Sequence, residues 1–289
     1  MMQPGVNELD GKSVVVTGGT AGIGLITARE LARRGARVIV VGRDPLRGEA
    51  AVATIERAVP GAGAVFLAAD LSSQQQVRAL AVALGNRVER LDVLINNAGA
   101  MFGKRALSVD GIEMTFALNH LAYFLLSHLL LDLLRRAGTA RIVNVASEAH
   151  RGVRLDFDNL EGQRHYSAWR AYKCSKLANL LFTYELARRL QGTDVTVNAL
   201  HPGFVATDIG VRQGLMPGWL WKGLTTFAID PEEGAKTSLH LAAAPELAWV
   251  SGRYFVKSRP VRSSSAALDG SAAERLWAVS EKLTGIGTI

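Results

Sequence analysis

The sequence predicts a single doubly wound α/β domain of the Rossmann type over residues 1–289, with a mostly parallel sheet of about seven strands. Short β-branched apolar runs alternate with longer segments of helical apolar spacing along most of the chain. The first run, 13–17, leads through a glycine-rich turn into the helical segment 25–34, and the apolar run 37–41 follows. This order of strand, helix and strand places the two strands parallel.

The remaining elements follow the same two patterns. Val14, Val15 and Val16 are typical of a buried strand, and Gly35 ends the first helix. No internal repeat or long Pro/Ser linker divides the chain, which favours one domain. Further strands are expected at 64–69, 91–95, 141–145, 195–200 and 253–256, and further helices at 46–58, 74–88, 111–136, 172–190, 231–243 and 271–283.

The segment 208–230 departs from this alternation. It is apolar without a clean helical period and contains Met216, Trp219, Trp221 and Phe227. We interpret it as a substrate lid, because apolar side chains over the site would grip a bulky molecule and exclude water. Contact with a second subunit, in a homo-oligomer, is the other interpretation.

Composition and charge exclude several classes of protein. The net charge is +7, but the basic residues are scattered, which indicates solvated helix faces rather than a nucleic-acid interface. Cys174 is the single cysteine, so no internal disulfide forms, and the six histidines lack metal-ligand spacing. Residues 1–12 are polar, and the longest apolar run, 121–134, is too short to cross a bilayer. We therefore expect a soluble cytoplasmic protein without a metal or a membrane span.

Gly18, Gly22 and Gly24 form a Gly-x-x-x-Gly-x-Gly turn between the first strand and the first helix, with Ile23 between the last two glycines. Small residues there let backbone N–H groups approach a pyrophosphate at the positive end of the helix dipole. The turn therefore predicts dinucleotide binding. The alternative is a glycine-rich turn that serves only close packing.

Two further turns would lie near the adenosine end of a dinucleotide. The second strand ends in Arg43 and Asp44, and the Arg43 guanidinium can form paired hydrogen bonds with a 2′-phosphate. We therefore favour NADP (NADPH) over NAD, with a solvated arginine as the alternative. Asp70 and Leu71 follow the third strand and would place a carboxylate near the adenine amino group, but Asp70 suits a helix N-cap equally well.

Tyr172 and Lys176 are four residues apart and therefore share one face of a helix. An ammonium near the phenol favours tyrosinate, so we expect the pKa of Tyr172 to fall below its usual value of about 10. Such a tyrosine can act as a general acid or base. Taken alone, Tyr-x-x-x-Lys also occurs by chance on amphipathic helices.

Together these motifs carry a family resemblance. In their order along the chain they are Gly18-x-x-x-Gly22-x-Gly24, Asn96-Asn97-Ala98-Gly99, Ser147, Tyr172-x-x-x-Lys176 and Pro202-Gly203. In this set the chain resembles the short-chain dehydrogenase/reductase family over almost its full length. The segments 91–99, 141–147 and 200–203 look like the retinol dehydrogenase branch. That branch commonly has an N-terminal membrane anchor, which the polar N-terminus here is expected to lack.

The resemblance implies a role for each matching residue. Tyr172 would donate a proton to a carbonyl, Lys176 would lower the pKa of that tyrosine and hold the nicotinamide ribose, and Ser147 would hydrogen-bond the substrate oxygen. Asn119 would hold a water that connects Lys176 to solvent. The other implied cofactor contacts are Asn97, Ala98 and Gly99 at the adenosine ribose, Pro202 and Gly203 beside the cofactor, and Val205 and Thr207 at the carboxamide.

We therefore predict an NADP-dependent carbonyl reductase or alcohol dehydrogenase for a bulky apolar substrate such as a polyketide, steroid or retinoid-like molecule. A non-catalytic scaffold that senses NADP is the alternative, although it would not need a complete set of serine, tyrosine, lysine and asparagine. A serine hydrolase built on Ser147 and His150 would need a Gly-x-Ser-x-Gly elbow, which does not surround Ser147. His150, Arg151 and Tyr166 lie in the loop between Ser147 and Tyr172. We interpret them as solvated loop residues, with contact to the substrate as the alternative.

Overall fold

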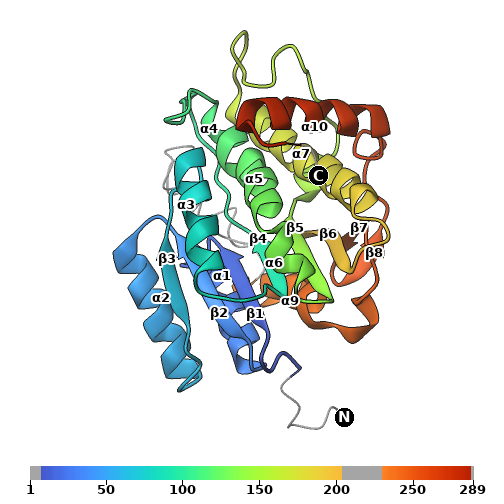
Figure 1. Cartoon of the computed structure of the whole chain (residues 1–289). Coiled ribbons are helices and arrows are strands. Elements are labelled where there is room, and N and C mark those ends of the chain that lie inside the picture. Colours follow the sequence, from blue (N-terminus) through green and yellow to red (C-terminus); the bar gives the residue numbers. More distant parts are fainter. Residues whose placement is uncertain (1–7, 204–229, 288–289) are drawn as a thin grey trace.

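A computed structural model describes residues 8–203 and 230–287 (Figure 1). Val205, Thr207 and the predicted lid up to residue 229 lie outside these ranges. The described chain forms one eight-stranded sheet in the order β3-β2-β1-β4-β5-β6-β7-β8, in which only the pairing of β7 with β8 is antiparallel. The strands are β1 (Ser13–Thr17), β2 (Arg37–Gly42), β3 (Val65–Ala68), β4 (Val93–Asn96), β5 (Ala140–Val145), β6 (Val195–His201), β7 (Arg253–Val256) and β8 (Arg259–Val261).

The predicted fold class is confirmed, with one strand more than expected. The additional strand, β8, returns from β7 through Lys257 and Ser258, which adopt positive φ angles of 50° and 58°. Two consecutive residues in this region form the tight turn that suits the twist of a β-hairpin. The strand is short and exposed, so it lacks the apolar run by which the other strands are recognised.

Helices cover both faces of the sheet. They are α1 (Gly22–Arg33), α2 (Pro45–Ala58), α3 (Gln74–Gly85), α4 (Met114–Phe116), α5 (Ala122–Leu129), α6 (Leu131–Arg135), α7 (Ala168–Arg189), α9 (Pro231–Ala243) and α10 (Gly270–Thr284). Alternate side chains of β1 enter opposite cores: Val14 and Val16 pack with α1, α2 and α9, whereas Val15 packs with α3, α5 and α7. Burial on both sides explains the continuous valine run of β1. In the described ranges, no helix has the length and apolar content to span a membrane.

The predicted helix 111–136 is wrong as a single element. The chain instead forms α4, a π-helical turn η1 (Ala117–Leu121), α5 and α6. Asn119 lies in η1, where its side chain bonds to groups outside the helix. π-Helical turns inside α-helices are frequent at functional sites.

The strand order determines where the predicted cofactor-binding residues lie. The chain leaves β1 toward β2 on one side, and β4 pairs with β1 on the other. In such sheets a crevice opens at the carboxyl ends of the strands where the order reverses. Gly18 directly follows β1 and Asn97 directly follows β4, so both lie at this crevice.

Candidate active site

Two positions of the glycine turn at this crevice admit no side chain. Gly18 has a φ of +64°, and a Cβ there would lie 2.8 Å from Ala98 Cα. A Cβ on Gly24 would lie 2.3 Å from the carbonyl oxygen of Gly18. Helix α1 begins at Gly22 after Ala21, whose methyl group cannot cap the first-turn N–H groups. The turn thus presents backbone donors and no side-chain bulk to an anion, as a pyrophosphate requires.

Asn97 holds the glycine turn in place. Its Nδ2 donates to the carbonyl oxygens of Thr17 at 2.8 Å and Gly18 at 3.2 Å, and its backbone N–H donates to Thr17 Oγ1 at 2.9 Å. The Asn97 Nδ2 is therefore engaged by the turn, which leaves the side-chain Oδ1 and the backbone carbonyl for the predicted ribose contact. The Ile23 side chain is likewise in the core, 8% exposed, so this residue reaches the crevice through its backbone.

Arg43 and Asp44, at the end of β2, have different surroundings. Arg43 is exposed, and its side chain is available to a 2′-phosphate. Asp44 is the N-cap of α2, and its Oδ1 accepts a hydrogen bond from the N–H of Arg47 at 3.3 Å. The Asp44 carboxylate is therefore engaged at the first turn of α2.

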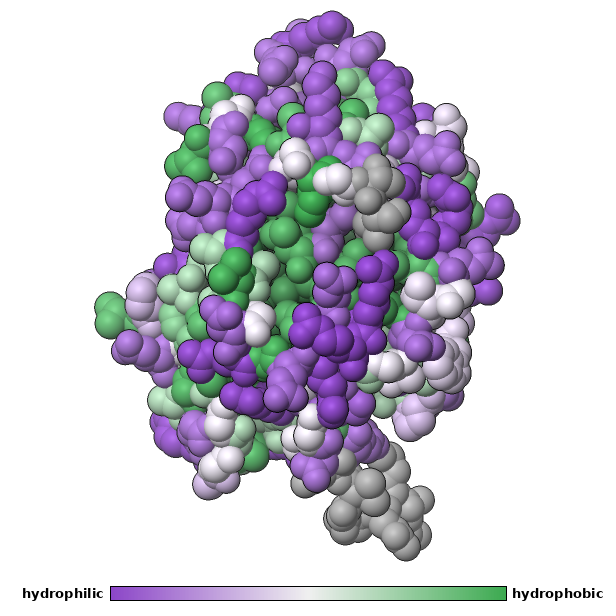
Figure 2. Space-filling model, in the orientation of Figure 1, coloured by the Kyte–Doolittle hydropathy of each residue, from purple (hydrophilic) through white to green (hydrophobic). Residues whose placement is uncertain are grey.

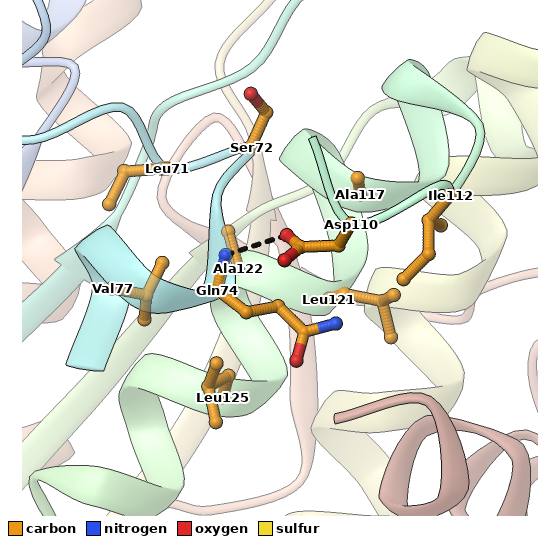
Figure 3. A pocket seen from close by; sticks show the side chains of 10 residues that line it. All are labelled: Leu71, Ser72, Gln74, Val77, Asp110, Ile112, Ala117, Leu121, Ala122 and Leu125. Atoms are coloured by element: carbon orange, nitrogen blue, oxygen red, sulfur yellow. Dashed lines mark hydrogen bonds between the residues drawn. The ribbon is translucent and has the colours of Figure 1, made fainter. Parts of the chain in front are cut away.

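The N-cap interpretation of Asp70 is wrong, whereas the contact with the adenine amino group stays a prediction. Ser73, rather than Asp70, is the N-cap of α3. Asp70 Oδ1 instead accepts from the N–H of Ser72 at 2.9 Å and from Ser72 Oγ at 2.7 Å. The Leu71 side chain is 6% exposed and lines a small cavity between α3 and α5 (Figure 3). Leu71 can therefore meet an adenine ring only through its backbone.

The four predicted catalytic residues come together at the carboxyl ends of β4 and β5. Ser147 lies two residues beyond the end of β5, and its side chain is close enough to the Tyr172 phenol to oppose the effect of burial on the pKa of that tyrosine. Lys176 is 4% exposed, and its Nζ donates to the carbonyl oxygen of Val145 at 2.8 Å. A Cβ on Gly99 would lie 3.3 Å from Asn119 Oδ1 and 3.5 Å from Lys176 Nζ, so both side chains lie on the same side of Gly99.

Ser175 is a residue that the sequence analysis missed. Its Oγ accepts from Asn119 Nδ2 at 3.0 Å and donates to the carbonyl oxygen of Tyr172 at 2.8 Å. Asn119 also binds both backbone groups of Ala100, at 2.8 Å and 2.9 Å. Ser175 therefore couples η1 to the turn of α7 that carries the tyrosine. Its place between Tyr172 and Lys176 was the only signal in the sequence.

The predicted fall in the Tyr172 pKa is not found. Burial raises the pKa of Tyr172 above its usual value, and the hydrogen bond with Ser147 only partly opposes this. The Lys176 ammonium does not offset the burial, since its Nζ lies 5.7 Å from the centre of the tyrosine ring and is bound to a carbonyl. Burial also lowers the pKa of Lys176 from 10.5 to about 8.

Trp169 is a second residue that was missed. It precedes Tyr172 by one turn of α7, and the two rings stack with centroids 5.9 Å apart and planes at 16°. Trp169 is 56% exposed. It offers an aromatic surface next to the tyrosine.

Ser147 and His150 do not form a hydrolase dyad. The His150 Nδ1 bonds to the backbone carbonyl of Ser147 at 2.6 Å rather than to its hydroxyl. Pro202 and Gly203 end the described part of this region, and Gly203 has a φ of 95° that favours glycine. They directly follow β6, the strand next to β5, as a role beside the cofactor requires.

Comparison with known proteins agrees with this geometry. A family model described as short chain dehydrogenase matches residues 12–216. Retinol dehydrogenase 12 of Mus musculus is 45% identical over 279 residues, which cover 96% of this chain and 88% of that protein. The crystal structure of an uncharacterized protein from Mycobacterium Paratuberculosis has a TM-score of 0.79 at 38% identity, covering 96% of this chain and 94% of that one. The Pseudomonas aeruginosa RhlG/NADP active-site complex has a TM-score of 0.70 at 30% identity, covering 88% and 97%.

Proposed function

This chain belongs to the short-chain dehydrogenase family of oxidoreductases, and we propose that it is an NADP-dependent carbonyl reductase or alcohol dehydrogenase for a bulky apolar substrate. One observation carries the proposal. Ser147, Tyr172 and Lys176 lie together at the same edge of the sheet as the glycine turn, which presents backbone donors and no side-chain bulk. When bound, NADPH supplies the hydride that reduces a ketone or aldehyde.

Side chains of this protein stabilise the substrate oxygen and supply the proton that it receives. Charge that develops on the substrate oxygen is met by two preplaced donors, the hydroxyls of Ser147 and Tyr172. Tyr172 gives its proton to that oxygen; burial raises its pKa, which keeps the phenol protonated at neutral pH but makes it a weaker acid, so proton transfer needs the tyrosinate to be stabilised. The Lys176 Nζ lies 5.7 Å from the centre of the Tyr172 ring, and its positive charge favours the tyrosinate that remains. Asn119, fixed by Ala100 and Ser175, would hold the water that restores the proton.

We base the proposed preference for NADP on the two residues at the end of β2. Arg43 is exposed there, while Asp44 is engaged in capping α2. The bacterial relative described as an RhlG/NADP complex supports the same cofactor. Arg43→Asp should weaken NADPH binding at least ~10-fold more than NADH binding, because it replaces a phosphate partner with a like charge. Arg47→Asp is the matched control, and equal weakening of both cofactors by Arg43→Asp would remove this assignment.

We base the proposed bulky apolar substrate on the exposed ring of Trp169. Its exposed indole beside Tyr172 can stack against a planar or polycyclic apolar substrate. The retinol dehydrogenase relatives, named for an apolar alcohol, fit this class. Trp169→Ala should raise KM at least ~5-fold for aromatic or steroidal ketones and leave a short aliphatic aldehyde unaffected, whereas Trp249→Ala should change neither. An equal effect of Trp169→Ala on both substrates would refute the stacking role.

Replacement of Tyr172 by Phe tests the reaction itself. NADPH oxidation would be followed in a panel of aromatic, steroidal and aliphatic carbonyls, with the alcohols and NADP in the reverse direction. The variant should lose more than ~10-fold in kcat/KM, or more than about 1.4 kcal/mol of transition-state stabilisation. Tyr184→Phe is the control. Tyr184 lies on the same helix as Tyr172, and its hydroxyl donates a hydrogen bond to Ser263. If Tyr172→Phe retains more than a tenth of wild-type kcat/KM, Tyr172 is not the acid.

A further inference from the structure

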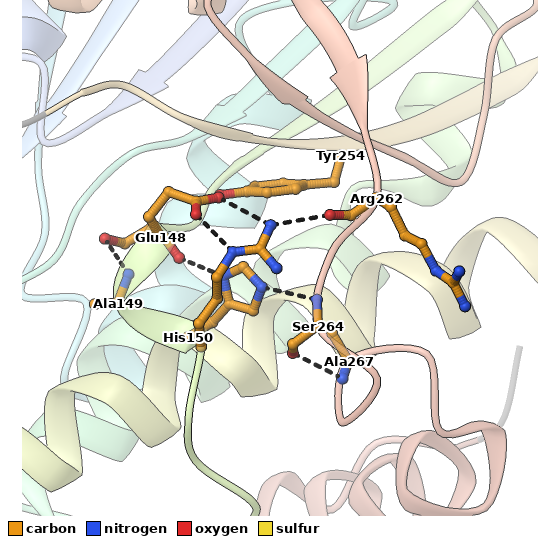
Figure 4. Close-up of polar contacts among 9 residues, drawn as sticks. Glu148, Ala149, His150, Tyr254, Arg262, Ser264 and Ala267 are labelled. Atoms are coloured by element: carbon orange, nitrogen blue, oxygen red, sulfur yellow. Dashed lines mark hydrogen bonds and ion pairs between the residues drawn. The ribbon is translucent and has the colours of Figure 1, made fainter.

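Ser147 is followed by one 3₁₀ turn, η2 (Glu148–His150), that is tied to the C-terminal part of the chain (Figure 4). The Tyr254 hydroxyl, from β7, donates to Glu148 Oε1 at 2.8 Å. Arg151 Nε donates to Glu148 Oε2 at 2.6 Å, and its Nη2 donates to the carbonyl oxygen of Arg262 at 2.9 Å. The segment after β8 therefore lies directly against the turn that begins at Ser147.

His150 lies in the middle of this cluster and uses both ring nitrogens. It is fully buried, contrary to its interpretation as a solvated loop residue. A carbonyl only accepts, so Nδ1 donates to the carbonyl oxygen of Ser147 at 2.6 Å. A backbone N–H only donates, so Nε2 accepts from Ser264 at 3.2 Å. Only the neutral imidazole with its proton on Nδ1 satisfies both partners.

These bonds fix the backbone of the serine. The carbonyl oxygen of Ser147 accepts from the backbone N–H of His150 at 3.1 Å in addition to the imidazole. Ser147 Oγ accepts from the N–H of Ala149 at 3.2 Å as the N-cap of the turn. Both the carbonyl and the hydroxyl of Ser147 are therefore set by η2, and η2 is set by the segment at Ser264.

We propose that His150 is a positioning residue for catalysis, which ties the carbonyl of Ser147 to the backbone at Ser264 and thereby aims the serine hydroxyl at the substrate oxygen. The inference rests on the proposed reductase function and goes beyond it, since it gives the C-terminal segment 262–267 a part in building the active site. His150 acts through Ser147, and it need not touch the substrate.

Protonation of His150 at low pH should break its hydrogen bond with the N–H of Ser264. Protonation would put a second N–H on the imidazole, facing the N–H of Ser264. Burial lowers the pKa of His150 below its ordinary value, the Ser147 carbonyl and Glu148 oppose this shift, and Arg151 adds to it. The other groups that face the cluster are Tyr254 from β7, edge-on at 5.3 Å, and His201 from β6. Activity that depends on the tie should therefore fall only below the ordinary histidine pKa of about 6.5.

A double-mutant cycle separates positioning from bulk stability. His150→Phe keeps the ring and removes both hydrogen bonds, so kcat should fall ~10-fold while the Kd for NADPH stays within ~2-fold. In a Ser147→Ala background, whose residual rate is measured first, the same replacement should cost less than ~2-fold, because there is no hydroxyl left to aim. Equal losses in the two backgrounds would overturn the proposal.

Two matched variants complete the test. His128 is another buried histidine whose Nδ1 bonds to a backbone carbonyl, that of Phe124 at 2.8 Å, so His128→Phe should leave kcat unchanged. His150→Asn can still donate to the carbonyl of Ser147 but does not titrate. Because it keeps the bond to Ser147 and loses the bond to Ser264, it should retain more kcat than His150→Phe and lose the acid limb of the pH profile. An unchanged acid limb in His150→Asn would assign that limb to another group.

Nuclear magnetic resonance tests the geometry without turnover. The ¹⁵N shifts of the His150 ring should report the Nδ1–H tautomer at pH 7 and protonation only below about pH 6.5. The Nε2–H tautomer would refute the tie whatever the activity. If wild type reduces no carbonyl in the panel while the ring shows the Nδ1–H form, the proposed function fails and the tie at Ser147 stands.

Discussion

Replacement of Lys176 by methionine should stabilise the folded protein at neutral pH while it removes activity. The lysine is 4% exposed, and burial lowers its pKa from 10.5 to about 8. At pH 7 the side chain is charged in both the folded and the unfolded chain, so the native state carries the full desolvation penalty. Methionine has a similar length and no charge, and it packs well in irregular apolar sites.

The size of the effect follows from the pKa change. One pH unit of difference is worth about 1.4 kcal/mol, so the fall from 10.5 to about 8 corresponds to a penalty of about 3 kcal/mol at pH 7. Loss of the Lys176 hydrogen bond to Val145 should cost about 1 kcal/mol in the variant. The net gain is therefore about 2 kcal/mol. It should vanish near pH 10, where the folded lysine is neutral and only the unfolded chain still binds the proton.

Urea unfolding of the cofactor-free protein at pH 7 and pH 10 would measure this difference. Lys173→Met is the matched control, because Lys173 lies on the same helix and is only partly buried. A Lys176→Met variant that is less stable than wild type at pH 7 would refute the reasoning. So would a stability difference that stays the same at both pH values.

Three other replacements test the structure around the site. Gly24→Ala would place a methyl group 2.3 Å from a carbonyl oxygen of the glycine turn, so NADPH should bind at least ~10-fold more weakly by fluorescence titration, whereas Gly85→Ala, with open space around it, should bind normally. Asp44→Ala should cost about 1 kcal/mol of unfolding free energy through the lost α2 cap and leave the ratio of NADPH to NADH affinity unchanged. Trp277→Ala, 2% exposed where α10 meets α5 and α7, should cost about 3–5 kcal/mol in urea unfolding. The exposed Trp249→Ala should cost less than about 0.5 kcal/mol.

The sequence by itself determined the features that depend on local geometry. The glycine turn could be predicted because its φ angles and its close approach to the chain admit no side chain at Gly18 and Gly24. The pairing of Tyr172 with Lys176 follows from the pitch of one helix. The alternation of buried strands and amphipathic helices predicts the parallel sheet, and with it the edge where these motifs meet.

Only the tertiary structure decided what each side chain does at that edge. Asn97 binds the glycine turn, and His150 binds Ser147 and Ser264, because segments far apart in the sequence meet there. The break at Asn119 was invisible for the same reason, since its partners Ala100 and Ser175 come from other elements. The pKa of Tyr172 depends on how completely the folded chain removes water from the phenol. Helical spacing to Lys176 predicts the pair, but burial, which belongs to the whole fold, sets the direction of the shift.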